Sequence, residues 1–173
     1  MKIEITKNLY GTILDVGGGG EGVIGQIYGN RVMSIDNRQD ELDEAPNCCE
    51  KRLMDAMNLL FPDSTFDNVT FFYSLMYMSH DTQRKAIKEA LRVLKSGGKL
   101  CIWDANIRSA YPDPFIVDLD IVSAEIRIQA TYCIVKNEVQ NMETVLGYLK
   151  NLGQKAITIS AKEEQFYICC EKR

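Results

Sequence analysis

Three glycines and two carboxylates near the amino end of the chain have types and spacing that suit a nucleotide-type ligand. The apolar stretch at 12–16 contains Asp15 and runs into Gly17, Gly18 and Gly19, and Asp36 follows 19 residues after Gly17. Glycines allow close backbone approach and positive φ, and a following helix offers free N–H groups at its start. An acid about 20 residues beyond such a turn can accept hydrogen bonds from ribose hydroxyls. The pattern predicts a site for an adenosine-bearing cofactor; the alternative is a glycine-rich surface loop.

Aromatic side chains and the single histidine follow the predicted strand at 66–73. Tyr73, Met76, Tyr77 and Met78 occupy the loop at the carboxyl end of this strand, where open α/β sheets bind ligands. We expect these residues to form the wall of a pocket for a second reactant. His80 begins the next helix, so it is either a helix-cap or surface residue or a general base. With one histidine and no CxxC spacing, the sequence predicts no metal site.

Alternating strands and helices must position these side chains. We expect strands at 12–16, 31–35, 48–54, 66–73 and 99–104, with helices from about residue 21, over 39–44 and over 81–95. The last of these helices has apolar residues at helical spacing, and Gly97 and Gly98 are expected to close it. Such alternation predicts an α/β fold with a doubly wound, mostly parallel sheet and right-handed crossovers.

The remainder of the chain departs from this alternation. Residues 115–136 alternate between apolar and polar types without a helical period, which predicts an antiparallel hairpin insertion. A helix over 140–152 follows, and strands near 155–160 and 165–171 must form a second, C-terminal antiparallel hairpin because few residues join them. Residues 1–173 are therefore expected to form a single domain. About ten residues precede the first strand, so we expect no N-terminal helical lid.

Composition narrows the classes of partner and compartment. The chain has 173 residues and a formal net charge of −4, which makes nucleic acid an unfavourable partner. No signal peptide or membrane span is recognisable, so a cytoplasmic location without membrane contact is expected. The six cysteines are expected to be reduced and to act as small hydrophobic residues. The apolar 115–136 segment offers an edge for a possible homodimer.

Two cofactors compete for the glycine-rich unit. Gly17, Gly19 and Gly22 match the GxGxxG pattern of nicotinamide-binding folds. However, the stretch at 13–19, the acid Asp55 after the third strand and the segment at 91–100 together resemble the class I S-adenosylmethionine-dependent methyltransferases, in particular methyltransferase type 11, over roughly residues 11–106. The third glycine of that family would fall at Glu21. The resemblance implies a Rossmann-like methyltransferase fold.

The resemblance also implies roles for individual residues. Asp36 would take the ribose hydroxyls, and Asp55 would meet the adenine together with the backbone of the two residues after it, although capping of the next turn is an alternative role for Asp55. The full set implied to bind the cofactor is Asp15, Gly17, Gly18, Gly19, Asp36, Asn37, Asp55, Ala56, Met57, Tyr73 and Ser74. The catalytic candidates are Tyr73, Tyr77 and His80.

The implied reaction is transfer of a methyl group from S-adenosylmethionine to a small-molecule acceptor, with S-adenosylhomocysteine as product. Orientation of the reactants alone can contribute about 7–11 kcal/mol, so a dedicated base is not compulsory. Two other functions stay open, because a fold hosts many functions. One is a non-catalytic S-adenosylmethionine-binding regulator or assembly protein, and the other is a nicotinamide-binding protein.

Overall fold

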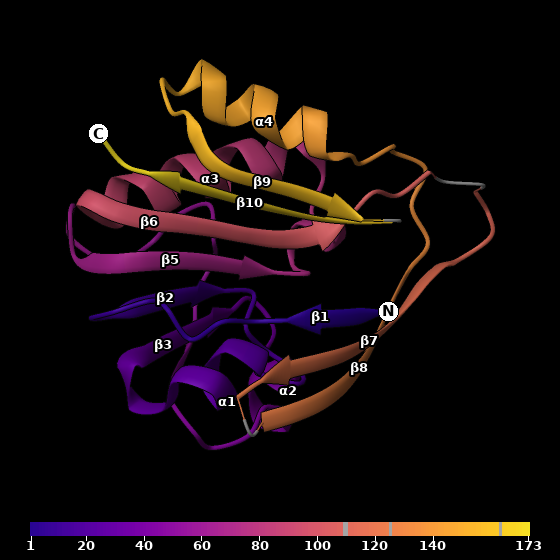
Figure 1. The fold of residues 1–173 in the computed structure, drawn as a ribbon, viewed down its shortest axis with the longest axis horizontal. Coiled ribbons are helices and arrows are strands. Elements are labelled where there is room, and N and C mark those ends of the chain that lie inside the picture. Colours follow the sequence, from indigo (N-terminus) through magenta and orange to yellow (C-terminus); the bar gives the residue numbers. More distant parts are fainter. Residues whose placement is uncertain (109–110, 125, 163) are drawn as a thin grey trace.

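A seven-stranded sheet forms the centre of the molecule, seen in a computed structural model that describes residues 1–108, 111–124, 126–162 and 164–173 (Figure 1). Its strand order is β4-β3-β2-β5-β6-β10-β9. Neighbouring strands are parallel from β4 to β6, and β10 is antiparallel to both β6 and β9. The strands are β2 (Ile13–Val16), β3 (Val32–Asp36), β4 (Glu50–Leu53), β5 (Phe66–Phe72), β6 (Leu94–Ala105), β9 (Ala156–Lys162) and β10 (Gln165–Glu171). The predicted fold class and the C-terminal hairpin are confirmed.

Helices cover the two faces of this sheet. Helix α1 (Val23–Tyr28) belongs to one hydrophobic cluster, while α3 (His80–Val93) and α4 (Met142–Asn151) belong to the other. The central strand β2 is buried at all four positions, as expected for a parallel strand covered on both faces. The short helix α2 (Gln39–Glu44) and the single turns η1 (Gly29–Arg31) and η2 (Leu75–Tyr77) complete the helical elements of the described residues.

A separate three-stranded sheet lies on the α1 side of the molecule. Strands β7 (Phe115–Ser123) and β8 (Ile126–Ile134) form the hairpin predicted for 115–136, with Phe115 opposite Ile134 and Ser123 opposite Ile126. Strand β1 (Lys2–Glu4) pairs in parallel with β7, far away in the sequence. The sequence did not predict β1, because it has only three residues and depends on this distant partner.

The junction between α3 and β6 differs from the expectation. The helix ends at Val93, and β6 begins at Leu94 and continues through Gly97 and Gly98, so these glycines do not close the helix. A Cβ on Gly98 would lie 2.7 Å from the Asp67 carbonyl oxygen of β5, which shows why glycine is required inside this strand. The predicted start of β6 at residue 99 was therefore too late.

No helix among the described residues combines the length and apolar character needed to cross a membrane. The longest, α3, has 14 residues and carries charged side chains along one side.

Candidate functional site

The glycine turn after β2 is held tightly against the chain's own backbone. The N–H groups of Gly17 and Gly18 both donate to the Ile35 carbonyl oxygen of β3, at 2.8 and 3.0 Å. Gly17 has a φ of 73°, and a Cβ there would lie 2.5 Å from the Cβ of Ser74. A Cβ on Gly18 would lie 2.3 Å from Asp15 Oδ2 and from Ser34 Oγ. These two glycines are thus required by packing before any ligand is considered.

Asp15 lies beneath this turn and is buried. Burial raises the pKa of its carboxyl to about 7, although the Thr70 hydroxyl donates to Oδ1 at 2.7 Å and opposes that rise, and the charge of Asp36 adds to it. The carboxyl of Asp15 therefore takes up a proton close to neutral pH. Its position fits a residue that shapes the turn from below.

Asp36 ends β3, and Asp55 follows the end of the neighbouring parallel strand β4 by two residues, so both lie at the carboxyl edge of the sheet. Asp36 is opposite Leu53 in the register, and the Met54 N–H donates to the Asp36 carbonyl at 2.8 Å. The Oδ2 atom of Asp36 lies 3.0 Å from where a Cβ of Gly19 would be, so a side chain at Gly19 would crowd this carboxylate.

The residues predicted to bind the cofactor at this edge differ in their exposure and in their contacts. Asp55 accepts a hydrogen bond from the Met57 N–H at 2.8 Å, which is the turn-capping contact considered as its alternative role. Asn37, Asp55 and Met57 are exposed, whereas Ala56 is half-buried against the cluster that contains α3. Capping uses only Oδ1 of Asp55 in this contact, so turn formation and ligand binding are compatible.

The loop after β5 joins the glycine turn to the small sheet. The Ser74 hydroxyl donates to the Val16 carbonyl at 2.7 Å, which ties this loop to the end of β2. Tyr73 has a φ of 51°, in the left-handed region that non-glycine residues seldom adopt. Its buried ring stacks on Tyr132 of β8 with centroids 5.2 Å apart and planes 6° apart, and its hydroxyl donates to Gln165 Oε1 at 3.2 Å.

Tyr77 lies at the surface beside the same strand of the small sheet. Partial burial raises the pKa of Tyr77 to about 12, against a backbone hydrogen bond from Cys133, and nearby Glu21 adds to the rise. Its phenol therefore stays protonated at neutral pH. Of the predicted acceptor-side residues, Tyr73 and Tyr77 are brought to one place by this arrangement.

Tyr132 and Glu21 were missed by the sequence analysis. Burial and the adjacent Glu21 carboxylate raise the pKa of the Tyr132 hydroxyl, so these side chains meet where β8 passes over the start of α1. The sequence feature that could have pointed to Tyr132 is the apolar–polar alternation of the hairpin, because Ile128, Ala130 and Tyr132 share one face of β8. Alternation could identify the inward face of the strand but not the residues that it would meet.

A buried polar network supports the loop from below. Asp104 at the end of β6 accepts hydrogen bonds from the N–H groups of Ala105 at 2.8 Å and Met76 at 3.3 Å, and from Gln140 Nε2 at 2.7 Å. Burial raises the pKa of Asp104 to about 6 in spite of these donors. Gln83 of α3 donates to Gln140 Oε1 at 2.6 Å. Asp104 therefore holds η2 in place from the protein interior.

Lys136 and His80 connect the same loop to the segment after β8. Lys136 Nζ donates to the carbonyl oxygens of Met76 and Met78, at 3.2 and 2.6 Å, on either side of Tyr77. His80 Nε2 lies 2.8 Å from the Val139 carbonyl oxygen, while Ser79 provides the N-cap of α3. This contact supports a surface and positioning role for His80 and occupies one of its two ring nitrogens.

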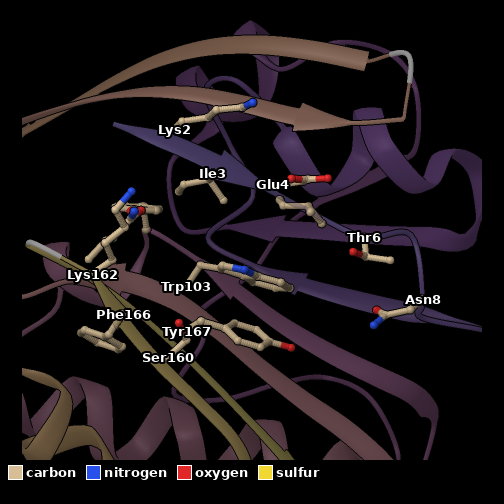
Figure 2. A pocket seen from close by; sticks show the side chains of 13 residues that line it. Lys2, Ile3, Glu4, Thr6, Asn8, Trp103, Ser160, Lys162, Phe166 and Tyr167 are labelled. Atoms are coloured by element: carbon tan, nitrogen blue, oxygen red, sulfur yellow. The ribbon is translucent and has the colours of Figure 1, made fainter.

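A cavity of about 300 Å³, with Tyr73 in its lining, lies between β1 and the strands β6, β9 and β10. Figure 2 shows Trp103 and Tyr167 in this cavity with Ile3 and Glu4 nearby. The rings of Trp103 and Tyr167 are 4.7 Å apart at their centroids. Tyr73 lines this cavity, whereas the glycine turn does not.

Comparisons with known proteins agree with this geometry. Residues 14–102 match the family model described as "Methyltransferase domain". The chain is 30% identical over 112 residues to the sterol 4-C-methyltransferase strm-1 of Caenorhabditis elegans, covering 60% of this chain and 33% of that protein. It is 50% identical over 52 residues to the ubiquinone/menaquinone biosynthesis C-methyltransferase UbiE of Laribacter hongkongensis, covering 30% of this chain and 20% of that protein. The chain thus spans a third or less of the length of these two curated relatives.

A solved structure extends the likeness to nearly the whole chain. A SAM-dependent methyltransferase from Methanosarcina mazei superposes with a TM-score of 0.68 at 18% identity, covering 95% of this chain and 93% of that chain. At this level of identity the match establishes the fold.

Proposed function

Because the chain belongs to the class I S-adenosylmethionine-dependent methyltransferases, we propose that it transfers a methyl group from S-adenosylmethionine to a small-molecule acceptor. The observation that carries this proposal is the edge where Asp36 faces Gly19 and Asp55 follows the end of the neighbouring strand β4. Open α/β sheets bind nucleotide ligands at the carboxyl ends of their strands. Two carboxylates and a turn without side chains are the groups that such a ligand requires.

The residues at this edge fit the cofactor. Asp36 would accept hydrogen bonds from the ribose hydroxyls, and Asp55 with Ala56 and Met57 would meet the adenine ring. Asn37 extends this surface beyond β3. A side chain on Gly19 would fill the space in front of Asp36, which supports close approach of a ligand at that point.

The turn and the loop after β5 would hold the methionine portion. Gly17 and Gly18 keep the turn compact, Asp15 shapes it from below, and Ser74 fixes the neighbouring loop to β2. When bound, S-adenosylmethionine supplies an electrophilic methyl group on a sulfonium. The chain's own contribution is to hold an acceptor atom in line with that group and to exclude water from it.

Three tyrosines are proposed to form the wall of the acceptor site. Tyr73 and Tyr132 present stacked rings, and Tyr77 adds a phenol that stays protonated at neutral pH. Aromatic faces can orient a flat acceptor and can stabilise positive charge near the reacting centre. The curated relatives named for a sterol and for ubiquinone and menaquinone support a small-molecule acceptor. His80 is the remaining candidate for proton transfer, through the ring nitrogen that does not contact Val139.

A non-catalytic cofactor-binding role is the second candidate. It is favoured by the hairpin strand β8, which packs Tyr132 on Tyr73 and beside Glu21, where an acceptor would have to enter. A protein that only binds the cofactor needs no acceptor path.

Calorimetric titration of the purified protein tests the cofactor assignment. We expect binding of S-adenosylmethionine and S-adenosylhomocysteine and none of NAD. The Asp36→Ala variant should lose about 1.5–3 kcal/mol of binding free energy for each hydrogen bond to the carboxylate that is removed. Asp43→Ala, at an exposed carboxylate of α2, is the matched control and should bind like wild type. Equal affinity of folded Asp36→Ala and wild type would contradict the assignment.

A product assay then separates enzyme from binder. Formation of S-adenosylhomocysteine is measured with a panel of phenols, quinols, sterols and amines as acceptors. Turnover with any member, lost on adding the Asp36→Ala change, supports the transferase. Tight cofactor binding without turnover across the panel supports the binding protein.

A further inference from the structure

Two cysteines face each other across the strands β6 and β10, on the face of the large sheet that carries the 300 Å³ cavity. Cys101 and Cys169 are directly opposite in the antiparallel register. Their sulfur atoms are 3.4 Å apart, with the Cys101 thiol donating to the Cys169 sulfur. Both side chains are buried, at 0% and 4% exposure. None of the roles argued for the methyltransferase site uses this pair.

The backbone at this pair is already compatible with a covalent bond between the two sulfurs. Opposed residues of antiparallel strands have Cα atoms about 4.5–5.5 Å apart. Disulfides in proteins span Cα separations of about 4.4–6.8 Å. Only the sulfur atoms must move closer, by rotation of the side chains, while the strand pairing from Gln165 to Glu171 stays in place.

The surroundings give the pair a nucleophile and place it in contact with a residue that lines the cavity. Hydrogen bonds from the Cys101 thiol and the Tyr167 hydroxyl, together with the positive charge of nearby Lys99, lower the pKa of Cys169 to about 7 against the effect of burial, so a thiolate is accessible at neutral pH. The Tyr167 hydroxyl lies 3.5 Å from the Cys101 sulfur, and the same Tyr167 lines the cavity. A small oxidant that enters the cavity therefore reaches a side chain in contact with the pair.

The other cysteines lack this arrangement. Cys170 is buried but lies opposite Leu100 and packs into the cluster on the other face of the sheet. Cys133 is exposed on β8, and Cys48 and Cys49 are half-buried neighbours in the chain before β4. The thiols of Cys48 and Cys49 also interact, but as neighbours in the chain, so the pair in β6 and β10 is distinguished by its register across two strands.

We propose that Cys101 and Cys169 are a redox-active dithiol, which a small hydroperoxide converts reversibly into a disulfide between β6 and β10. The Cys169 sulfur attacks one peroxide oxygen, the O–O bond breaks, and a sulfenic acid and one water (from hydrogen peroxide) or alcohol are formed. The Cys101 sulfur then attacks the Cys169 sulfur, the S–O bond breaks, and the hydroxyl leaves as water with the Cys101 proton. Two thiols are oxidised and one peroxide is reduced.

This bond would join the strand that carries Asp104 to the strand that carries Gln165. Asp104 supports η2, and Gln165 accepts the hydrogen bond of Tyr73. Trp103 and Tyr167, the next opposed pair along the same face, lie in the cavity. The oxidised protein therefore holds the cavity floor and the support of Tyr73 in one covalently fixed position.

The test uses the whole chain, reduced and then treated with a small excess of hydrogen peroxide. Intact-mass measurement should show a loss of about 2 Da, and a digest without reductant should contain one peptide pair joined through Cys101 and Cys169. Titration should find two fewer thiols than the six of the reduced protein. Dithiothreitol should restore the original mass.

Matched variants locate the bond. Cys101→Ser and Cys169→Ser should each abolish the 2 Da loss, with Cys101→Ala as a second variant if a buried hydroxyl prevents folding. Cys133→Ser, at the exposed cysteine, should form the bond like wild type. A cross-link between other cysteines, or addition of oxygen without any cross-link, would overturn the proposal. Because the readout is mass, it does not depend on the proposed methyl transfer.

Discussion

The two sides of the proposed site are built in different ways. The proposed cofactor side comes mainly from one continuous stretch, in which β2, the glycine turn, α1 and β3 follow each other along the chain, with Asp55 added from beyond β4. The acceptor side depends on distant segments, since Tyr73 meets Tyr132 and Gln165. The first side is specified by local residue types, and the second by how two sheets pack together. Local motifs can thus reveal a cofactor while concealing the acceptor.

Substitution of the glycine turn should have the largest effect on the cofactor side. In Gly18→Ala, the new Cβ would overlap Asp15 Oδ2 and Ser34 Oγ, because both lie 2.3 Å from its position. We expect a loss of about 1–3 kcal/mol in the free energy of unfolding, typical of overpacking, together with loss of S-adenosylmethionine binding. Urea denaturation and calorimetric titration measure the two effects.

The matched control for this change is Gly147→Ala in α4, where an added Cβ would meet nothing within 4 Å. A helical alanine should stabilise the protein by about 0.5–1 kcal/mol there and leave cofactor binding unchanged. If Gly18→Ala and wild type had equal stability and equal cofactor affinity, the claim that packing requires glycine at this position would be contradicted.

On the acceptor side, Tyr132→Ala should separate turnover from cofactor affinity. It removes the ring stacked on Tyr73, so we expect kcat/KM for the acceptor to fall by about 10- to 100-fold, equivalent to about 1.4–2.7 kcal/mol. The dissociation constant of S-adenosylhomocysteine should change much less. Tyr132→Phe keeps the stacked ring and loses the hydroxyl beside Glu21, so it distinguishes stacking from hydrogen bonding. A large loss of cofactor affinity in Tyr132→Ala would mean that Tyr132 also contributes to cofactor binding, and would contradict a separate acceptor side.

A third prediction concerns the buried carboxyl beneath the glycine turn. The folded-state pKa of Asp15 is raised from 3.8 to about 7 by burial, so the folded protein binds more protons than the unfolded chain between these values. Its contribution to stability is therefore present below pH 4 and is lost as the pH rises through 7. Relative to wild type, Asp15→Asn should gain free energy of unfolding between about pH 4 and 7 and then level off. Denaturation at several pH values measures this difference, and a constant difference would contradict a raised pKa.

The smallest effect is expected at Lys136, which contacts the loop after β5 from the segment after β8. Lys136→Met removes the bonds from Nζ to the carbonyl oxygens of Met76 and Met78, on either side of Tyr77. A hydrogen bond contributes about 0.5–1.5 kcal/mol net, so we expect kcat/KM to fall by about 2- to 10-fold. Lys150→Met, at an exposed lysine of α4, should leave the rate unchanged. A decrease of equal size in both variants would mean that the loop is not held by Lys136.

Most helices and strands were predictable from the sequence because their signals are local. Helix α2 and the hairpin of β7 and β8 were expected within a residue or two of their observed bounds. The carboxyl edge with Asp36 and Asp55 follows from strand order alone, since parallel strands end on the same side. The position of these two carboxylates could therefore be predicted without knowing any distant contact.

What the sequence could not predict depends on tertiary contacts. Strand β1 forms by pairing with β7, and its three residues contain no pattern from which that pairing could be predicted. Gly97 and Gly98 are residues typical of a helix end, but both lie within β6: Gly98 is required there by its close approach to Asp67, and Gly97 has a positive φ of 74°. Tyr132 is an ordinary inward-facing hairpin residue until β8 is seen to lie beside Tyr73.

The left-handed backbone of Tyr73 lies where the loop after β5 touches both sheets. The Tyr73 ring stacks on Tyr132 of β8, whereas the hydroxyl of the next residue, Ser74, donates to the end of β2. A displacement of the small sheet is therefore expected to reach the glycine turn through one peptide bond of this loop as well as through the core that the two sheets share.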